Sequence, residues 1–345
     1  MDWNLYKSEF ERYAESNGYD SSYTERCLKY AHRLHEQNLP IIYSLEHLAS
    51  LVGLDESYLR FVSYDPNKFY RSFSVKKNSG GERQIDEPLP NLKLVQRWIL
   101  ENILYRLEPS PFAKAFVPGR SIKDNAKFHR NKPMVLTLDI KDFFPSISSA
   151  RINSFFKGAG YSPKVCYFLT RLCTLNGSLP QGAPTSAALS NLVFLALDRQ
   201  IATYCINKDV RYTRYADDLT FSGQFVVSEI INFTRSALST LGFRLNDNKT
   251  RLMRSHERQQ VTGIVVNRKL QIPREVRRSL RQAVYFIERF GLDNHVARLN
   301  ECRANYLLHL LGEATFIRFI NPNDRDAEKA ISVLHEIRNS QLSFV

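Results

Sequence analysis

The chain has 345 residues, a length that is sufficient for two or three subdomains around shared cores. Its residues are 43% hydrophobic and 12% aromatic, as in a globular protein. Its 48 Lys and Arg outnumber 35 Asp and Glu, and the net charge of +13 favours nucleic acid or an anionic membrane surface as partner. No apolar stretch approaches the roughly 20 residues of a membrane helix, the start lacks a signal-peptide pattern, and five scattered cysteines predict reduced thiols, so we expect a cytoplasmic protein without a membrane partner.

The N-terminal part is predicted to be helical. Residues 1–35 have a helical pattern, and Ser44 then indicates the start of a helix that Gly53 ends. Asp55 can cap a second helix. Two helices around a glycine-containing turn also occur in helix-turn-helix proteins. Because the second helix is poor in Arg and Lys, we favour an α-hairpin that packs on the rest of the chain.

A β-hairpin is predicted next, over residues 70–86, with a turn at Asn78–Gly81. Val75 and Ile85 flank that turn. The basic residues of the hairpin are Arg71, Lys76, Lys77 and Arg83. Further helices are predicted at 89–107, 163–175, 185–198, 273–290 and 295–311.

Three aspartates stand where β-prone runs end or turn. An apolar run from Val135 ends at Asp139, and the Tyr-Ala-Asp-Asp segment at 215–218 places Asp217 and Asp218 at the turn of a second hairpin. Two carboxylates this close repel unless a cation neutralises them, and hard oxygen ligands suit Mg²⁺. If Asp139 meets them in the fold, the set could hold two metal ions. The alternative is an exposed Asp-Asp turn beside an unrelated strand end.

The order of four motifs resembles that of reverse transcriptases. Residues 138–147 resemble their motif A, 179–186 their motif B, 215–218 their motif C and 242–250 their motif D. The resemblance implies an α+β right-hand polymerase with fingers, palm and thumb, in which the palm sheet is antiparallel and the N-terminal and thumb regions are helical.

Two further segments resemble the signatures of bacterial retron reverse transcriptases. Asn125 and His129 fit the Asn-Ala-x-x-His signature, and Val261–Gly263 fits the Val-Thr-Gly signature. The sequence shows no maturase or endonuclease domain, which disfavours a group II intron protein. We therefore expect an N-terminal helical region at 1–65, fingers at 66–134, a palm at 135–267 with finger helices inserted at about 150–178, and an RNA-binding thumb at 268–345.

The resemblance to reverse transcriptases implies a role for each of the three aspartates. Asp139, Asp217 and Asp218 would be catalytic and would bind two Mg²⁺ ions, with deoxynucleoside triphosphates as substrates. The backbone carbonyl of Ile140 would join the metal ligands, and Asp218 would contact metal more weakly than Asp217. We interpret the nearby Asp142 as structural.

Four residues are predicted to contact the incoming nucleotide. Arg83 could clamp the triphosphate because a guanidinium matches phosphate oxygens, and Phe144 would exclude a ribose 2′-hydroxyl. Gln181 would bond the nucleotide or the template, and Lys249 would approach the pyrophosphate. The alternatives are a core position for Phe144, an exposed loop for Gln181 and a solvated surface for Lys249.

RNA contacts are predicted at two places. Asn125 and His129 would lie on one helical face and recognise the cognate RNA, or else form a helix cap with a satisfied histidine. The thumb stripe, defined by its four arginines, would contact the phosphates of a duplex. These arginines are Arg274, Arg277, Arg278 and Arg281.

Retron membership would imply a defined product and defined partners. The enzyme would reverse transcribe a structured noncoding RNA, starting from the 2′-hydroxyl of a branching guanosine, to give multicopy single-stranded DNA. A host RNase H would trim the template, and an effector or toxin protein would act with the complex in antiphage defence. The alternatives are a reverse transcriptase of the diversity-generating or abortive-infection type, or a noncatalytic RNA-binding scaffold.

Overall fold

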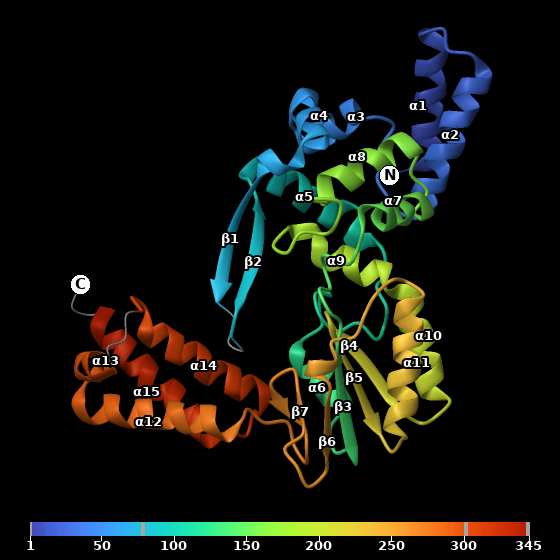
Figure 1. Ribbon diagram of the computed structural model, residues 1–345. Coiled ribbons are helices and arrows are strands. Elements are labelled where there is room, and N and C mark those ends of the chain that lie inside the picture. The colour runs from blue at the N-terminus through green and yellow to red at the C-terminus, as the bar shows by residue number, and fades with distance from the viewer. Residues whose placement is uncertain (1, 77–79, 300–302, 343–345) are drawn as a thin grey trace. The chain divides into compact units, whose positions relative to one another are not determined.

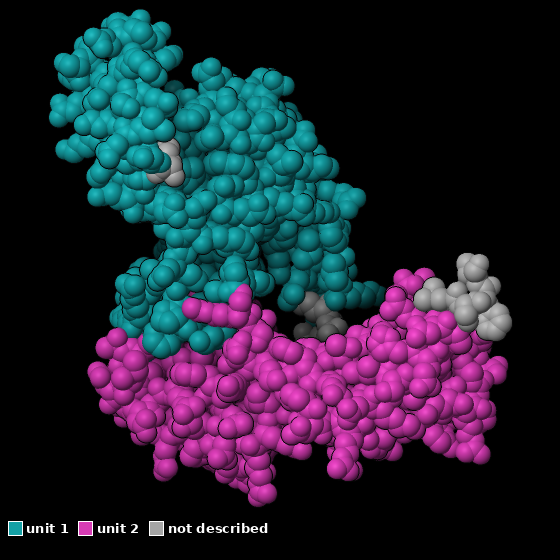
Figure 2. All heavy atoms as spheres, turned by 180° about the vertical axis from the view of Figure 1, so that it is seen from behind, with its two compact units in different colours: residues 1–118, 140–201, 232–245 teal, residues 119–139, 202–231, 246–345 magenta. Residues whose placement is uncertain are grey.

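The computed structural model describes residues 2–76, 80–299 and 303–342, and its chain divides into two compact units. Unit 1 comprises residues 1–118, 140–201 and 232–245, and unit 2 comprises 119–139, 202–231 and 246–345 (Figure 2). The two units do not coincide with the four predicted regions, whose boundaries stay a prediction.

Unit 1 is mainly helical (Figure 1). Its elements are α1 (Trp3–Ser16), α2 (Ser21–Glu36), α3 (Leu45–Val52), α4 (Glu56–Tyr64), η1 (Pro66–Phe69), β1 (Tyr70–Lys76), β2 (Glu82–Pro88), α5 (Pro90–Asn102), η2 (Leu104–Arg106), α7 (Ser149–Gly158), α8 (Pro163–Cys173) and α9 (Pro184–Val193). Two more helices contribute residues to both units, α10 (Leu195–Ile206) and α11 (Val227–Ser239).

The predicted N-terminal helices are confirmed. The Ser44 hydroxyl accepts a hydrogen bond from the His47 amide at the start of α3, and Gly53 ends that helix in the left-handed conformation. Asp55 precedes α4 but makes no side-chain cap bond.

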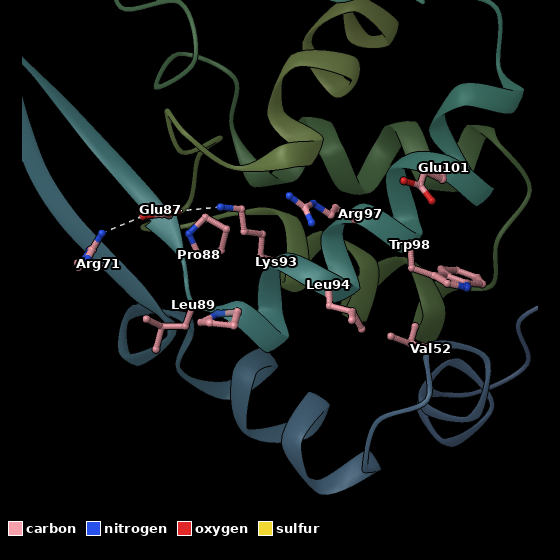
Figure 3. A pocket seen from close by; sticks show the side chains of 11 residues that line it. Val52, Arg71, Glu87, Pro88, Leu89, Lys93, Leu94, Arg97, Trp98 and Glu101 are labelled. Carbon is pink, nitrogen blue, oxygen red and sulfur yellow. Dashed lines mark hydrogen bonds and ion pairs between the residues drawn. The ribbon is translucent and has the colours of Figure 1, made fainter. Parts of the chain in front are cut away.

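The hairpin predicted in unit 1 is confirmed as β1 and β2, which pair from Tyr70 opposite Pro88 to Lys76 opposite Glu82. Asn78 and Ser79 of the predicted turn, together with Lys77, lie outside the described residues. A hollow of about 800 Å³ lies at the base of this hairpin and along α5 (Figure 3). There the Glu87 carboxylate forms ion pairs with Arg71, whose Nη2 atom lies 3.2 Å from Oε2, and with Lys93, whose Nζ atom lies 2.8 Å from Oε1. The hollow contains none of the predicted site residues.

Unit 2 is built on a four-stranded antiparallel sheet with the strand order β4-β5-β3-β6 (Figure 1). Its elements are α6 (Ile122–Phe128), β3 (Met134–Asp139), β4 (Arg211–Tyr215), β5 (Asp218–Gly223), η3 (Asp247–Lys249), β6 (Arg251–Arg254), β7 (Gln260–Val261), β8 (Ile264–Val265), α12 (Arg274–Phe290), α13 (Leu292–Leu299), α14 (Tyr306–Ile320) and α15 (Arg325–Leu342). The predicted α+β class with an antiparallel sheet is thereby confirmed.

One apolar core joins the sheet of unit 2 to its C-terminal helices. Val135 from β3 and the hairpin residues Val261 and Ile264 are fully buried with Leu280 of α12 and Ala314 of α14. Burial of this kind contributes roughly 25 cal/mol for each Å² of apolar surface removed from water. The same core therefore fixes the β7-β8 hairpin beside the sheet.

Three predicted helices differ in their bounds from those in the structure. The prediction for 89–107 is too long, because α5 ends at Asn102 and a 3-10 turn follows. The helix predicted at 185–198 is two helices that meet at Phe194, whose ring packs against Phe143 and Phe243. The single helix predicted at 295–311 is wrong.

Two helices, α13 and α14, replace that last prediction, although no Pro or Gly lies between residues 292 and 311 to indicate a break. The helix α14 also continues through Gly312, because glycine inside a helix costs only about 1 kcal/mol and packing can offset it. Among the described residues, no helix has both the length and the apolar character to cross a bilayer.

Candidate active site

A tight hairpin turn presents two of the three predicted catalytic aspartates. Tyr215 at the end of β4 pairs with Asp218 at the start of β5, so Ala216 and Asp217 alone form the turn. Ala216 has a φ of 57°, a left-handed conformation that costs a side chain roughly 1 kcal/mol. The buried Arg214 holds the turn by donating a hydrogen bond from Nη1 to the Ala216 carbonyl at 3.2 Å. The predicted turn at the acids is confirmed.

The third aspartate meets this hairpin through the register of the sheet. Asp139, the last residue of β3, lies directly opposite Asp218 on β5. Opposite residues of an antiparallel pair share one face, with Cβ atoms roughly 4.5–5.5 Å apart. Asp139 is only 6% exposed, whereas Asp217 and Asp218 are half-buried. The structure therefore brings the three carboxylates together from strands far apart in the sequence.

The electrostatics of the site follow from this crowding. The pKa of Asp218 is raised from 3.8 to about 6, first by burial and then by the charges of Asp217 and Asp139, while the charge of Lys249 opposes the shift. The pKa of Lys249 is in turn raised, first by its hydrogen bond to Asp139. The site thus concentrates negative charge that a cation would stabilise.

Lys249 supplies such a positive charge. Its Nζ atom lies 2.8 Å from Oδ2 of Asp139, and its side chain is 57% exposed. The residue ends the 3-10 turn η3, which the sheet places beside β3 because the amide of Asn246 donates to the Asp139 carbonyl at 2.8 Å. An exposed ammonium on a flexible stem can leave Asp139 when another cation binds.

Asp139 and Asp218 line a hollow of about 440 Å³. Its lining includes Arg251 and Arg258, which the sequence did not indicate, and the turn residues Thr262 and Gly263 of the Val-Thr-Gly signature. Arg258 is held by Glu275 at 2.8 Å, whereas Arg251 is exposed and lies opposite Thr137 in the sheet. Only its place directly after motif D could have indicated Arg251 in the sequence.

The carboxylates fit a hard divalent cation. All three donors are carboxylate oxygens, and the ammonium of Lys249 already stands against one of them. Within the described part of the chain, no group of three or more His, Cys, Asp or Glu side chains forms a preformed metal cage. Mg²⁺ does not need one, since it usually takes one or two carboxylates and completes its shell with water and substrate phosphates.

The residues predicted to contact the nucleotide lie in unit 1, apart from Lys249. Phe143 is buried against Phe194, and the adjacent Phe144 is only half-buried. Gln181 belongs to a loop that docks on β2, because its carbonyl accepts a hydrogen bond from the Asp86 amide at 2.8 Å. Arg83 is exposed on β2. Ile140 follows Asp139 directly and bridges to Leu245 in unit 1.

Asn125 and His129 do not have the exposure that their predicted contact with RNA requires. Both side chains are fully buried, so neither can contact RNA in this conformation. His129 hydrogen-bonds Thr213 and Ser222 at 2.7 Å each, and Asn125 accepts a hydrogen bond from Thr213 at 2.6 Å. The alternative of a satisfied buried histidine at the end of α6 agrees with these contacts, because buried polar groups need partners.

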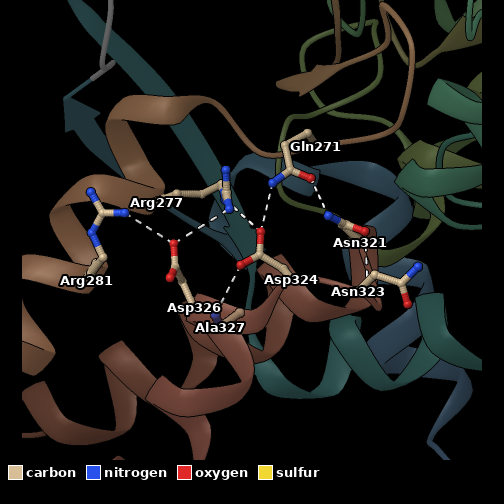
Figure 4. A network of polar contacts seen from close by, with 8 residues as sticks. All are labelled: Gln271, Arg277, Arg281, Asn321, Asn323, Asp324, Asp326 and Ala327. Atoms are coloured by element: carbon tan, nitrogen blue, oxygen red, sulfur yellow. Dashed lines mark hydrogen bonds and ion pairs between the residues drawn. The ribbon is translucent and has the colours of Figure 1, made fainter.

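The thumb stripe divides into two kinds of arginine (Figure 4). Arg277 Nε lies 2.7 Å from Oδ2 of Asp324, whose side chain is fully buried, and Arg281 lies 3.3 Å from Asp326. Arg274 and Arg278 are exposed on the same helix. Half of the predicted RNA-binding stripe is therefore engaged in ion pairs with the first turn of α15 and the residue before it.

Removal of the negative charge of Asp218 should stabilise the protein when no metal is bound. Because the folded pKa of Asp218 exceeds its unfolded value, native stability is lost as the pH rises through about 6. We expect Asp218→Asn to raise the free energy of unfolding by on the order of 2 kcal/mol at pH 7.5 in EDTA, and to have no effect near pH 4. Urea titrations at both pH values measure this. As a control, Asp55→Asn changes an exposed residue that makes no side-chain cap bond, and it should leave the free energy of unfolding unchanged at both pH values. Equal stability of Asp218→Asn and wild type at pH 7.5 would show that the charge of Asp218 does not destabilise the fold.

Comparisons with known proteins agree with this geometry. Residues 75–266 match the family model "Reverse transcriptase (RNA-dependent DNA polymerase)". The fold and the site therefore define an RNA-directed DNA polymerase, and the family confirms the predicted right-hand polymerase class. Such enzymes use divalent metal ions, deoxynucleoside triphosphates and an RNA template.

Two curated relatives narrow the class. Retron Mx65 reverse transcriptase of Myxococcus xanthus is 35% identical over 318 residues, which cover 85% of this chain and 72% of the relative. Retron Ec86 reverse transcriptase of Escherichia coli is 34% identical over 260 residues, 74% of this chain and 81% of the relative. The chain belongs to the retron reverse transcriptases. Among solved structures, a Candida albicans telomerase in complex with a telomeric RNA fragment is similar at a TM-score of 0.45 and 10% identity, covering 82% of this chain and 67% of that chain.

Proposed function

We propose that this reverse transcriptase copies a cognate structured noncoding RNA into DNA with two Mg²⁺ ions held at Asp139, Asp217 and Asp218. The observation that carries the proposal is the pairing of Asp139 with Asp218, one residue beyond the Asp217 turn. Acids paired in this way, in a chain similar to retron enzymes, favour catalysis over a noncatalytic scaffold.

The three acids would differ in how strongly they hold the ions. Asp139 and Asp217 would hold both ions, the carbonyl oxygen of Ile140 would complete one shell, and Asp218 would contact metal more weakly. When bound, the ions would activate the primer hydroxyl and neutralise charge on the triphosphate and the pyrophosphate. The raised pKa of Asp218 means that its negative charge is costly at this place, and a bound cation would stabilise it.

Basic side chains would position the substrates around the acids. Lys249, which is exposed and mobile on its stem, could turn from Asp139 towards the leaving pyrophosphate. Arg251 lines the hollow and is suited to a phosphate of the primer strand. Arg83 would clamp the triphosphate, and Gln181 would bond the nucleotide or the template.

Phe144 is proposed as the gate against ribonucleotides. Its neighbour Phe143 fills the core, which leaves the half-buried Phe144 ring to face a ligand. We expect Phe144→Val to raise the ratio of ribonucleotide to deoxynucleotide incorporation by roughly 10-fold or more, since one lost steric contact is worth about 1–3 kcal/mol. Single-nucleotide extension assays measure the ratio. Phe128→Val, at an exposed aromatic that ends α6, serves as control; an unchanged ratio for Phe144→Val would refute the gate.

The thumb stripe would bind RNA through its exposed members. We expect Arg274→Gln with Arg278→Gln to lower the slope of log Kd against log salt by roughly one to two, because each phosphate contact releases about one counterion. Arg277→Gln should instead destabilise the fold by about 3 kcal/mol, because it removes the positive charge beside the buried Asp324, which keeps only its neutral donors Gln271 and the Ala327 amide. RNA titrations at several salt concentrations and thermal unfolding separate the two effects. A salt slope unchanged in the double variant would contradict the RNA contact.

The retron relatives support a defined product. Synthesis would start from the 2′-hydroxyl of a branching guanosine and yield multicopy single-stranded DNA joined to RNA. A host RNase H would trim the template, and an effector or toxin protein would complete a cytoplasmic antiphage complex. The predicted division into an N-terminal region, fingers, palm and thumb belongs to the same proposal.

Expression with the flanking genomic DNA tests this product. We would purify the protein, extract its bound nucleic acid, and compare RNase and DNase digestion for wild type and Asp217→Asn. A short DNase-sensitive DNA joined to RNA, absent from the variant, is expected. RNA alone in both samples would favour a scaffold. DNA that lacks a branch would favour a diversity-generating or abortive-infection type of enzyme.

A further inference from the structure

The two retron signatures meet in the fold, although Asn125 and Thr262 are 137 positions apart. The amide nitrogen Nδ2 of Asn125 donates to the Thr262 hydroxyl at 3.4 Å. Its amide oxygen accepts the Thr213 hydroxyl at 2.6 Å. One buried side chain on α6 therefore links the β7-β8 turn to the strand β4.

His129 extends the network to the second strand of the catalytic hairpin. Its Nε2 atom lies 2.7 Å from the Thr213 hydroxyl, and its Nδ1 atom lies 2.7 Å from the Ser222 hydroxyl. A threonine hydroxyl has a single proton, which Thr213 already donates to Asn125. His129 Nε2 must then donate to Thr213, and in the neutral ring Nδ1 accepts from Ser222. This assignment gives each of the bonds at Thr213 and His129 one donor and one acceptor.

The network lies on the same sheet face as the catalytic acids. Pairing places Thr213 opposite Thr220 and Ser222 opposite Arg211, and Ser222 is four residues from Asp218 on one strand. Residues an even number apart on a strand share a face. Thr213 and Ser222 are fully buried, and a buried bond is costly to leave unmade. Helix α6 therefore fixes the base of the hairpin whose turn carries Asp217.

At its other end the network reaches a strained turn. Thr262 has a φ of 46° and Gly263 a φ of 86°, between β7 and β8. A β-branched residue in the left-handed region is an outlier that persists only where its surroundings hold it. The buried Val261 and Ile264 anchor the flanks, and both turn residues line the hollow that Asp139 and Asp218 share.

We infer that Asn125 and His129 are positioning residues that hold the Asp217–Asp218 hairpin and the Thr262–Gly263 turn at a fixed separation across the catalytic hollow. They act through Thr213, Ser222 and Thr262 and do not touch substrate. The inference rests on the proposed catalytic role of the three acids. It gives the two retron signatures one shared task within the protein. A direct contact with RNA would instead need exposed side chains, and those of Asn125 and His129 are buried.

Substitution of Thr213 tests the network at its centre. Thr213→Val keeps the shape but leaves Asn125 Oδ1 and His129 Nε2 without their shared partner, whereas Thr213→Ser keeps the hydroxyl. We expect Thr213→Val to lower the single-turnover rate of nucleotide addition by about 10- to 100-fold, since a 1 Å misplacement can cost about 100-fold. The Kd for template RNA should stay within about 2-fold, and Thr213→Ser should restore the rate.

A second position keeps the test open if Thr213→Val does not fold. Thr262 lies in a half-buried turn, so Thr262→Val should fold, and Thr262→Ser keeps the hydroxyl. We expect Thr262→Val to slow addition and Thr262→Ser to restore it. Because Asn125→Ala removes the same bond, the double variant should lose no more rate than the worse single one. Additive losses would overturn the link between the two signatures.

Two other results would overturn the inference. A Kd for RNA raised by more than about 10-fold, with the addition rate intact, would show direct RNA recognition. A lowered melting temperature with a normal rate for the folded enzyme would show an ordinary core contact. Asp217→Asn is assayed beside these variants. If it stays active, the catalytic assignment fails; if it is inactive while Thr213→Val keeps its full rate, only the positioning role fails.

Discussion

Asp217→Asn is expected to lower DNA synthesis on a primed RNA template by about 1000-fold or more, and Asp139→Asn to do the same. Each substitution removes an anionic oxygen from the set that would hold the metal ions, and such a loss amounts to several kcal/mol of transition-state stabilisation. Binding of template RNA should stay within about 2-fold, because neither acid attracts a phosphate backbone. Steady-state extension assays and RNA titrations measure both quantities.

Asp142→Asn provides the control for this loss of activity. Asp142 lies three residues after Asp139, is exposed and has a φ of 47°, a conformation that asparagine adopts readily. We expect it to keep nearly full activity. An Asp217→Asn enzyme as active as wild type would end the assignment of the acids.

Gly182→Ala is the second change with a large expected effect. A Cβ atom at Gly182 would lie 2.9 Å from both the Asp86 carbonyl oxygen and Cγ2 of Ile85, and the residue has a φ of 130°. The backbone of β2 cannot yield without losing the hydrogen bond from the Asp86 amide to the Gln181 carbonyl. We expect a loss of stability of about 1–3 kcal/mol and a fall in kcat/KM for deoxynucleotides of roughly 10- to 100-fold.

Gly177→Ala separates backbone strain from collision. Gly177 also has a positive φ, of 77°, but no atom lies within 4 Å of the position of an added Cβ. This variant should lose only about 1 kcal/mol and keep its activity. Thermal unfolding and nucleotide titrations compare the two glycines. If both variants lose activity equally, the docking of the Gln181–Gly182 loop on β2 has no specific role.

The elements around the site could be predicted from local sequence. Asp139 follows a continuous apolar run, and the Tyr-Ala-Asp-Asp segment lies between two β-prone stretches, so a strand end and a hairpin turn were both expected. The break between α13 and α14 was not predicted, because residues 292–311 contain no Pro or Gly, although Asn305, which precedes α14, is a residue type that often starts a helix. The packing of Tyr306 against His295 depends on contacts made after that break.

Several roles depended on burial, which a linear pattern does not report. Asn125 and His129 looked like exposed groups on a helix, yet both are fully buried against Thr213 and Ser222. Arg277 looked equivalent to Arg274 and Arg278, yet it alone pairs with the buried Asp324. Arg251 drew no attention, because only the register of β6 on β3 places it in the hollow.

By itself, the sequence determined the family, the three candidate acids and the presence of a hairpin turn at two of them, because these depend on short motifs and on periodicity along the strand. Only the tertiary structure decided that Asp139 faces Asp218, that Lys249 neutralises Asp139, and that Asn125 bridges Thr213 to Thr262. These contacts join segments distant in sequence. Their geometry is set by strand register and by burial in a shared core, which no local pattern encodes.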